Sequence, residues 1–153
     1  MYDVQRLKTI DECQIVLARA KAAGKRDVYN VVFRRLCEIG GTEQDDLDDP
    51  LVRDFYEALA AYEQLLTEKH GKRTLASYTR RSVNNKGVYQ SVLEWAGEKQ
   101  EKEGFVLLTD MGMPEYTAEY LVSPYAKRFP DDVVRRANGR LTSHGVTLPS
   151  AAS

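Results

Sequence analysis

The chain has 153 residues, of which 42% are hydrophobic and 29% are charged, and its formal net charge is -1. This length suits a single domain, and the composition excludes the class of disordered chains, which combine low hydrophobicity with high charge. The small net charge excludes a general attraction of the whole molecule to polyanions, so any surface for nucleic acid must be local.

The N-terminus and the cysteines indicate a cytoplasmic protein. Met1 to Lys8 holds charged residues and lacks the apolar stretch of a signal peptide, and no segment reaches the ~18 apolar residues of a membrane span. Cys13 and Cys37 lie within apolar helical patterns, which is typical of buried thiols in a reducing compartment. We therefore expect no disulfide and no membrane partner.

The first helix is predicted between Thr9 and Gly24. Thr9 followed by Glu12 is a capping box, and apolar residues then recur at helical spacing until the glycine. The residues of this apolar stripe are Ile10, Cys13, Leu17 and Ala20.

A second helix is predicted from Asp27, acting as its cap, to Gly40 and Gly41. Its apolar stripe consists of Val28, Val31, Val32, Leu36 and Ile39. Together with the first helix it predicts a helical hairpin, with Arg34 and Arg35 on the outer face.

The longest helix is predicted from Pro50 to His70, and Gly71 ends it. Acidic residues precede it, where they complement the positive end of the helix dipole. These carboxylates are Glu43, Asp45, Asp46, Asp48 and Asp49, and the apolar face of the helix consists of Leu51, Phe55, Ala58, Tyr62 and Leu65.

The next helix is predicted to be capped by Thr74 and to stop at Asn85-Lys86-Gly87. Its inward side is expected to carry Leu75, Tyr78, Thr79 and Val83. A further helix follows from Val88 to Ala96, in which we interpret Trp95 as a packing residue.

The remaining chain alternates helices with linkers. A charged linker is predicted at 97–104, followed by helices over 105–111, 114–121 and 130–141, and 146–153 is expected to be a disordered tail. No segment shows the period-two alternation of strands, and no residues repeat at a fixed solenoid period. The sequence therefore predicts an all-α, compact bundle of about seven to eight helices built from helix-turn-helix hairpins, as a single domain over 1–145.

Motifs for catalysis or metal binding are missing from the sequence. His70 and His144 stand far apart, no CxxC, HxxxH or GxSxG occurs, and Asp45 to Asp49 lacks the glycine and terminal glutamate of a calcium loop. The sequence thus predicts no metal, no cofactor and no enzymatic activity. Catalytic groups that converge from distant segments stay open as an alternative.

A basic segment stands out between Glu68 and Glu94, where the chain holds cations and no acid. Arginine binds phosphate or guanine, asparagine pairs with adenine, and serine bonds phosphate or base edges. We therefore expect phosphate contacts from Lys72, Arg73, Arg80, Arg81 and Lys86, and base contacts from Ser77, Asn84 and Asn85.

The placement of this basic helix suits a helix-turn-helix, because the long helix ends at Gly71 and the basic helix begins near Thr74. The register departs from the motif at Lys72, Ser77 and Arg80, which stand where it has apolar residues. The packing of the two helices would therefore have to differ from the standard motif.

Two functions remain in competition. The first is a small helical nucleic-acid-binding module, with DNA favoured, that acts through the basic helix at about 72–86. The second is a non-catalytic protein-interaction or accessory domain, or self-association, through exposed aromatics such as Tyr116, Tyr120 and Tyr125.

Ordinary structural roles compete with both functions. Basic runs are usually solvated faces, and the acidic loop from Glu43 to Asp49 could neutralise this one. Tyrosines at helical spacing are more often core residues, and Arg135-Arg136 is expected on an exposed polar face.

Two stretches, LLTEKHGKRTLASYTRR from Leu65 to Arg81 and GFVLLTDMGMPEYTAEYLV from Gly104 to Val122, resemble a pattern in uncharacterised small bacterial proteins. The resemblance covers about the last two-thirds of the chain. It implies a bacterial, cytoplasmic origin and assigns no activity, cofactor or site residue.

Overall fold

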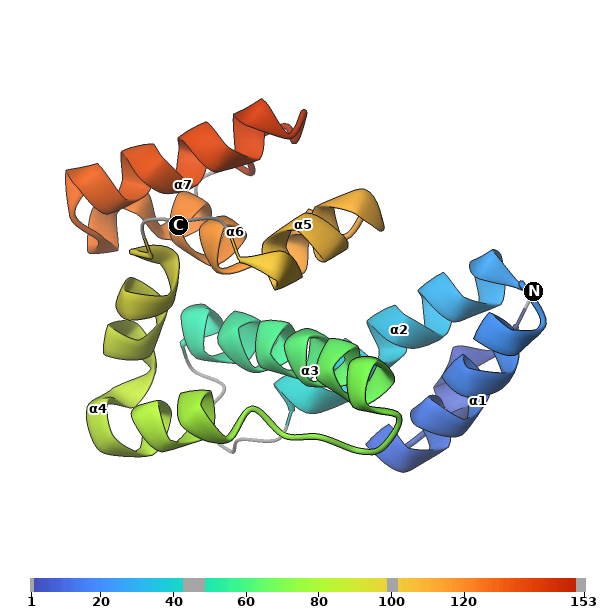
Figure 1. The fold of residues 1–153 in the computed structure, drawn as a ribbon. Coiled ribbons are helices and arrows are strands. Elements are labelled where there is room, and N and C mark those ends of the chain that lie inside the picture. Colours follow the sequence, from blue (N-terminus) through green and yellow to red (C-terminus); the bar gives the residue numbers. More distant parts are fainter. Residues whose placement is uncertain (1, 43–48, 99–101, 151–153) are drawn as a thin grey trace.

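The structure, a computed structural model, describes residues 2–42, 49–98 and 102–150 (Figure 1). These residues form α-helices and short 3-10 helices without any strand, so the all-α prediction is confirmed. The α-helices are α1 (Ile10–Ala22), α2 (Arg26–Gly41), α3 (Pro50–His70), α4 (Ser77–Ala96), α5 (Glu103–Asp110), α6 (Ala118–Val122) and α7 (Asp131–Ser143).

Local signals set the ends of the first two helices. The predicted cap of α1 is confirmed, because Thr9 Oγ1 accepts from the Glu12 N–H at 3.1 Å, while the Glu12 carboxylate reaches back to the Lys8 N–H, one residue before the cap, at 3.1 Å. The predicted cap of α2 is wrong. Lys25 is the N-cap and makes no side-chain capping bond, while Asp27 lies in the first turn, where it still complements the helix dipole.

The buried face of α2 differs from the predicted stripe. Val31 is 40% exposed, whereas Tyr29, Phe33 and Cys37 are buried together with the predicted Val32 and Leu36. The reason is that α2 packs against both α1 and α3, so its buried surface is wider than one stripe and turned from the one expected.

The contact between α2 and α3 is close because a glycine lies at the crossing. A Cβ on Gly40 would fall far inside the van der Waals contact distance of the Ala60 Cβ. The pair Gly40 and Gly41 was expected only to end α2, and the structure gives the first of them a packing role as well.

Both ends of α3 agree with the prediction. Asp49 accepts from the Leu51 N–H at 3.0 Å ahead of Pro50, and Gly71 ends the helix in the left-handed region at a φ of 74°. Arg128 donates to both Asp49 carboxylate oxygens, at 2.9 and 3.0 Å, which lowers the pKa of this carboxyl. The other predicted acids of this loop, at 43–48, lie outside the described residues.

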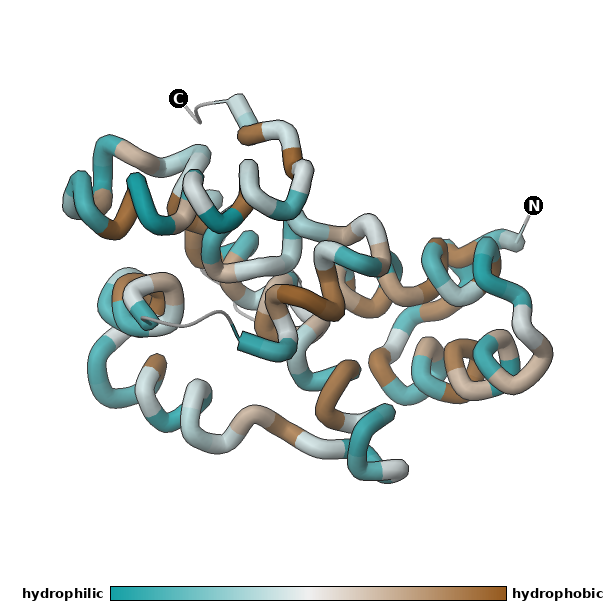
Figure 2. Tube along the Cα trace, turned by 45° about the horizontal axis from the view of Figure 1, so that its top comes forward, coloured by the Kyte–Doolittle hydropathy of each residue, from teal (hydrophilic) through white to brown (hydrophobic). Residues whose placement is uncertain are grey.

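The later helices cover α3 from another side. Figure 1 shows α5, α6 and α7 above α3, with α1 and α2 to the right and the bent α4 at the left and below. One buried apolar cluster extends from Leu7 to Ala137 and joins these groups of helices. In Figure 2, hydrophobic and hydrophilic residues alternate along the helices, as expected where each helix buries one face.

Trp95 is a packing residue, as predicted. Its ring lies 6.0 Å from that of Phe55, edge to face, and 6.0 Å from that of Tyr62. The residues at 146–150 follow α7 without regular structure, and 151–153 lie outside the described part, so the disordered tail stays a prediction. None of the helices in the described ranges is long and apolar enough to cross a membrane.

We predict that Gly40→Ala lowers the free energy of unfolding by about 1–3 kcal/mol, because the added methyl group has no space against Ala60. Gly139→Ala is the matched control: this glycine lies within α7, and a Cβ there meets nothing within 4 Å. The control should raise the free energy by about 0.5–1 kcal/mol through helix propensity. Urea unfolding followed by circular dichroism measures both, and equal effects would contradict the close packing of α2 on α3.

Candidate nucleic-acid interface

The basic helix is the first half of α4. Helix α4 bends at Gly87, whose φ of 85° and ψ of 170° are not helical and fall in a region that favours glycine. The predicted stop at this glycine is therefore confirmed. Beyond the bend, the second half buries Val92 and Ala96 and lies against α6 and α7, whereas the first half, 77–86, runs beside α3.

The first half of α4 exposes a row of polar side chains around one aromatic ring. We call this surface the α4 outer face. It consists of Ser77, Tyr78, Arg81, Asn84 and Asn85, all of which are exposed. Tyr78 is 74% exposed, which is the largest value among the exposed large hydrophobic residues.

A buried carboxylate determines which side of α4 faces outward. The Glu63 side chain on α3 is only 11% exposed, and it accepts from the Arg80 guanidinium at 2.6 Å and 2.7 Å. The same carboxylate accepts from the Ala76 N–H at 2.8 Å, just before the helix begins. The Arg80 side chain is thereby turned toward α3 and made part of the fold.

The predicted start of this helix is wrong, and so is half of its predicted inward side, although Thr79 and Val83 are half-buried as the prediction requires. Thr74 does not cap it, because its hydroxyl donates to the Lys72 carbonyl and the helix begins at Ser77. Leu75 is 48% exposed and Tyr78 is 74% exposed, although both were expected inside, and Ala76 is buried instead. The contacts of Glu63 with Ala76 and Arg80 explain the difference, because they fix the rotation of the helix about its axis.

The other predicted phosphate-contacting cations stay at the surface. Arg73 pairs with Asp11 at 2.6 Å, and Lys86 pairs with Glu94 at 3.0 Å, with every one of these side chains at least 41% exposed. The second pair raises the pKa of Lys86 and lowers that of Glu94. Exposed pairs contribute little to stability, so a phosphate can replace the carboxylate in either.

Lys72 and Arg81 are exposed, and neither makes an ion pair with another residue of the described part of the chain. Asp49, the described residue of the acidic loop, binds Arg128 and not the basic helix. The partners of the basic segment come instead from α1, α3, α4 itself and α5, through Asp11, Glu63, Glu94 and Glu103.

The other arginines that could extend the surface hold the fold together. Arg34 pairs with Glu115 and donates to the Gly112 carbonyl at 3.2 Å. Arg35 is only 12% exposed and donates to the Leu7 carbonyl at 3.0 Å, so its predicted place on the outer face is wrong. Arg136 donates to the Gly97 carbonyl at 2.6 Å, whereas its neighbour Arg135 is exposed as predicted.

Two of the three tyrosines proposed as partner anchors belong to the core. Tyr116 and Tyr125 are 8% and 9% exposed, and Tyr120 is half-buried. Tyr125 donates to Asp54 at 2.6 Å, which satisfies its hydroxyl inside the protein. Tyr116 and Tyr125 therefore offer little aromatic surface to a partner, and Tyr120 offers only part of its ring.

Both cysteines of the chain are buried, and the described residues contain no cluster of metal ligands. Cys13 and Cys37 are free and buried, and burial raises the pKa of Cys13 to about 11 and that of Cys37 well above its ordinary value. Within the described ranges, no group of three or more histidine, cysteine, aspartate or glutamate residues is placed to hold a metal ion.

Sequence reasoning missed two residues that shape this surface, Glu63 and Tyr78. The signal for Glu63 was its spacing: it follows the buried Phe55 and Leu59 at four-residue intervals, so it lies in an apolar stripe. A glutamate in such a stripe needs a buried cation as its partner. No comparable signal exists for Tyr78, because its exposure depends on the partner that Glu63 selects.

Comparisons of the chain with protein-family models, with curated proteins and with solved structures give no match. The resemblance to small bacterial proteins therefore stays a prediction, and the function has to be argued from the site.

Neighbouring arginines in α4 should respond differently to substitution. Arg80→Ala leaves the Glu63 carboxylate buried without its cation, so we expect the free energy of unfolding to fall by about 2–3 kcal/mol. The loss is smaller than for a fully buried pair, because the Arg80 side chain is 30% exposed. Arg81→Ala, the matched control, should change it by less than about 0.5 kcal/mol. Urea unfolding separates the two, and similar values for both would contradict the anchoring role of Glu63.

Proposed function

We propose that this protein is a small helical nucleic-acid-binding module, with DNA as its preferred polymer, and that it binds through the α4 outer face. The observation that supports this most is the exposure of Ser77, Tyr78, Arg81, Asn84 and Asn85 on one side of one helix. The chain between Glu68 and Glu94 contains no acid that could repel a phosphate from this side.

Each residue type on the surface has a role in nucleic-acid binding. Arg81 and Lys72 supply charge for phosphates, and Arg73 and Lys86 can exchange their exposed carboxylate partners for phosphates. Asn84, Asn85 and Ser77 are the residues we assign to base edges. Arg80, which the sequence placed among the phosphate contacts, instead serves to orient the helix.

The dimensions of the helix support a groove contact. The segment 77–86 is about 15 Å long at the rise of an α-helix, and an α-helix fits the major groove of DNA. The two helices do not form a standard helix-turn-helix, because the connection from Gly71 to Ala76 is longer than the turn of that motif. The proposed contact uses α4 alone and does not need the motif. Tyr78 adds a ring on which an unpaired base can stack.

The proposal places the protein in the cytoplasm and gives it no catalytic role. Nucleic acid and a reducing environment are both found there, and the buried free thiols of Cys13 and Cys37 are consistent with such an environment.

A protein partner is the second candidate, favoured by one specific observation. Leu75 and Tyr78 are 48% and 74% exposed and lie close together in sequence at the start of α4. An exposed apolar pair with arginine beside it is a common feature of protein interfaces.

We predict that the purified protein binds fluorescent duplex DNA saturably in anisotropy titrations, and that the affinity falls as salt rises because bound phosphates release counterions. Arg81→Glu should weaken binding roughly tenfold and make the slope of log K against log salt less negative by about 0.9. Arg81 is chosen alone because a change at Arg80 would also disturb the fold.

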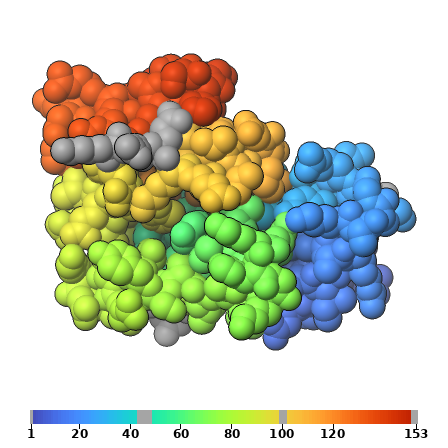
Figure 3. Space-filling view, viewed as in Figure 1, coloured from blue at the N-terminus to red at the C-terminus, as the bar shows by residue number. Residues whose placement is uncertain are grey.

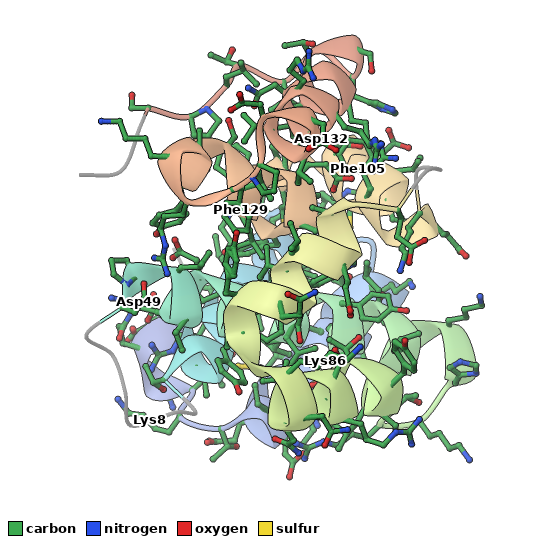
Figure 4. All side chains as sticks on the ribbon, turned by 90° about the vertical axis from the view of Figure 1, so that its left-hand side faces the viewer. Lys8, Asp49, Lys86, Phe105, Phe129 and Asp132 are labelled. Carbon is green, nitrogen blue, oxygen red and sulfur yellow. The ribbon has the colours of Figure 1, made fainter. Side chains whose placement is uncertain are left out.

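Arg135→Glu is the matched control, since it makes the same charge change on α7. Figure 4 places Asp132, at the start of α7, at the top of the molecule and Lys86, beside the bend of α4, in its lower half. Equal loss of binding in the two variants would show a general charge effect and contradict the α4 outer face. Single-stranded RNA serves as the second polymer.

The absence of binding to either polymer at low salt would overturn the nucleic-acid proposal and leave the protein partner. Self-association through Leu75 and Tyr78 predicts a dimer by light scattering that becomes a monomer in Leu75→Glu. A monomeric wild-type protein would exclude this form of the second candidate.

A further inference from the structure

A cavity of about 150 Å³ lies where α3, α4, α5 and the start of α6 meet, away from the α4 outer face. Four aromatic side chains line it, Tyr62, Trp95, Phe105 and Tyr116, together with leucines of α3 and α5. Figure 3 shows the surface hollowed on this side of the molecule, between α3, α4 and α5. An apolar protein cavity of about this volume is known to hold one benzene ring.

The polar groups around the cavity give it a positive balance. Lys69, Lys102 and Arg140 line it against two carboxylates, Glu103 and Glu119. Arg140 and Glu119 bind each other at 3.0 Å with side chains 9% and 6% exposed. Breaking this buried pair would be costly, so its two charges are not available to a ligand.

The two lysines at the cavity are available to a ligand. Lys69 contacts Glu103 at 3.5 Å and Lys102 contacts Glu98 at 3.5 Å, and all of these side chains are at least 50% exposed. Pairs this long and this exposed are weak and exchange readily. A ligand anion near the lysines would therefore gain charge contacts without disturbing the core.

Two hydrogen-bond donors of the lining are also left unused by the fold. The Trp95 indole N–H and the Tyr62 hydroxyl belong to half-buried side chains whose rings lie 6.0 Å apart, and neither atom is among the buried polar atoms without a partner in the described part of the chain, so both reach solvent or a ligand in the cavity. Buried or half-buried tryptophan and tyrosine usually find a partner for these groups. A bound carboxylate or hydroxyl can supply it.

We propose that this cavity binds a small aromatic carboxylic acid, with its single ring among the aromatic side chains and its carboxylate toward Lys69 and Lys102. The volume admits one ring. None of the lining residues belongs to the α4 outer face, so this proposal does not depend on nucleic-acid binding.

Trp95 reports directly on occupancy, because it is the single tryptophan of the chain and lines the cavity. Titration with benzoate, excited at the red edge of tryptophan absorption, should change the emission saturably, with a dissociation constant of about 1 mM or lower. Benzylamine, of the same size and opposite charge, should bind at least about tenfold more weakly. N-acetyltryptophanamide under the same titration corrects for light absorbed by the ligand.

Gly104→Leu tests the location. A Cβ on Gly104 would lie 3.5 Å from the Tyr62 ring, an ordinary contact, so the larger side chain extends into the cavity without strain at its root. We expect it to abolish the benzoate response. Gly139→Leu, on α7 where a Cβ meets nothing, is the matched control and should retain it.

Three outcomes would overturn the proposal. They are the absence of a saturable wild-type response to benzoate, equal binding of benzylamine, and unchanged binding by a folded Gly104→Leu variant. The first two need no variant, so the proposal is tested even if Gly104→Leu does not fold. Ligand-observed NMR saturation transfer on the wild-type protein provides a second readout that is independent of fluorescence.

Discussion

The buried carboxylate of Glu63 is the interaction on which the candidate surface depends. A carboxylate at this depth is tolerated only with a cation and further donors, and the chain supplies both from one segment, through Arg80 and the Ala76 N–H. Because both donors lie at the beginning of α4, their contacts with α3 fix the position and the rotation of that helix together. The exposed side then follows from helical geometry, since Tyr78, Arg81 and Asn85 lie about opposite the half-buried Val83, while Ser77 and Asn84 lie next to Arg80 on its solvent side.

Gly87 is the second constraint, and it separates two roles within α4. A straight helix would carry one buried stripe along its whole length, and the outer face would then continue to Trp95. The left-handed backbone at Gly87 lets the second half turn toward α6 and α7 and bury Val92 and Ala96. Apart from the anchor at Glu63, the first half reaches the core only through Ala76, just before it, and the half-buried Val83, which leaves its other sides free to carry polar side chains.

Much of the fold could be predicted from the sequence, because helix ends are encoded by residues that act locally. The capping box at Thr9, the Asp49-Pro50 start and the stops at Gly71 and Gly87 each depend on neighbours within a few positions. Rotation of a helix about its axis is different. It depends on which distant elements pack against the helix. The predicted inward sides are therefore wrong at Val31, on the helix α2 that packs between α1 and α3, and at Tyr78.

The candidate site could be predicted only in part, for the same reason. Residue types and their order identified a basic, asparagine-containing helix, but the sequence could not show which cations are committed to the fold. Arg80 and Arg81 are adjacent and chemically identical, yet one binds a buried carboxylate and the other is exposed. By charge alone, the acidic loop from Glu43 to Asp49 was a reasonable partner for the basic helix. The actual partner of Arg80 is Glu63 on α3, and the only sequence signal for Glu63 is its position in the apolar stripe of that helix.

The same distinction between committed and exchangeable charges applies to the whole molecule. Two arginines, Arg80 and Arg140, bind carboxylates that are at most 11% exposed, and removing either would strand a buried charge. The remaining cations of both candidate sites are either paired with exposed carboxylates or without an ion-pair partner among the described residues. A ligand anion that binds these cations therefore displaces water or a weak ion pair and breaks no interaction that stabilises the fold. The charge that is available to a ligand is therefore smaller than the count of lysines and arginines. A protein with a net charge of -1 can still present such local anion-binding surfaces, because its buried pairs remove charge of both signs from the surface equally.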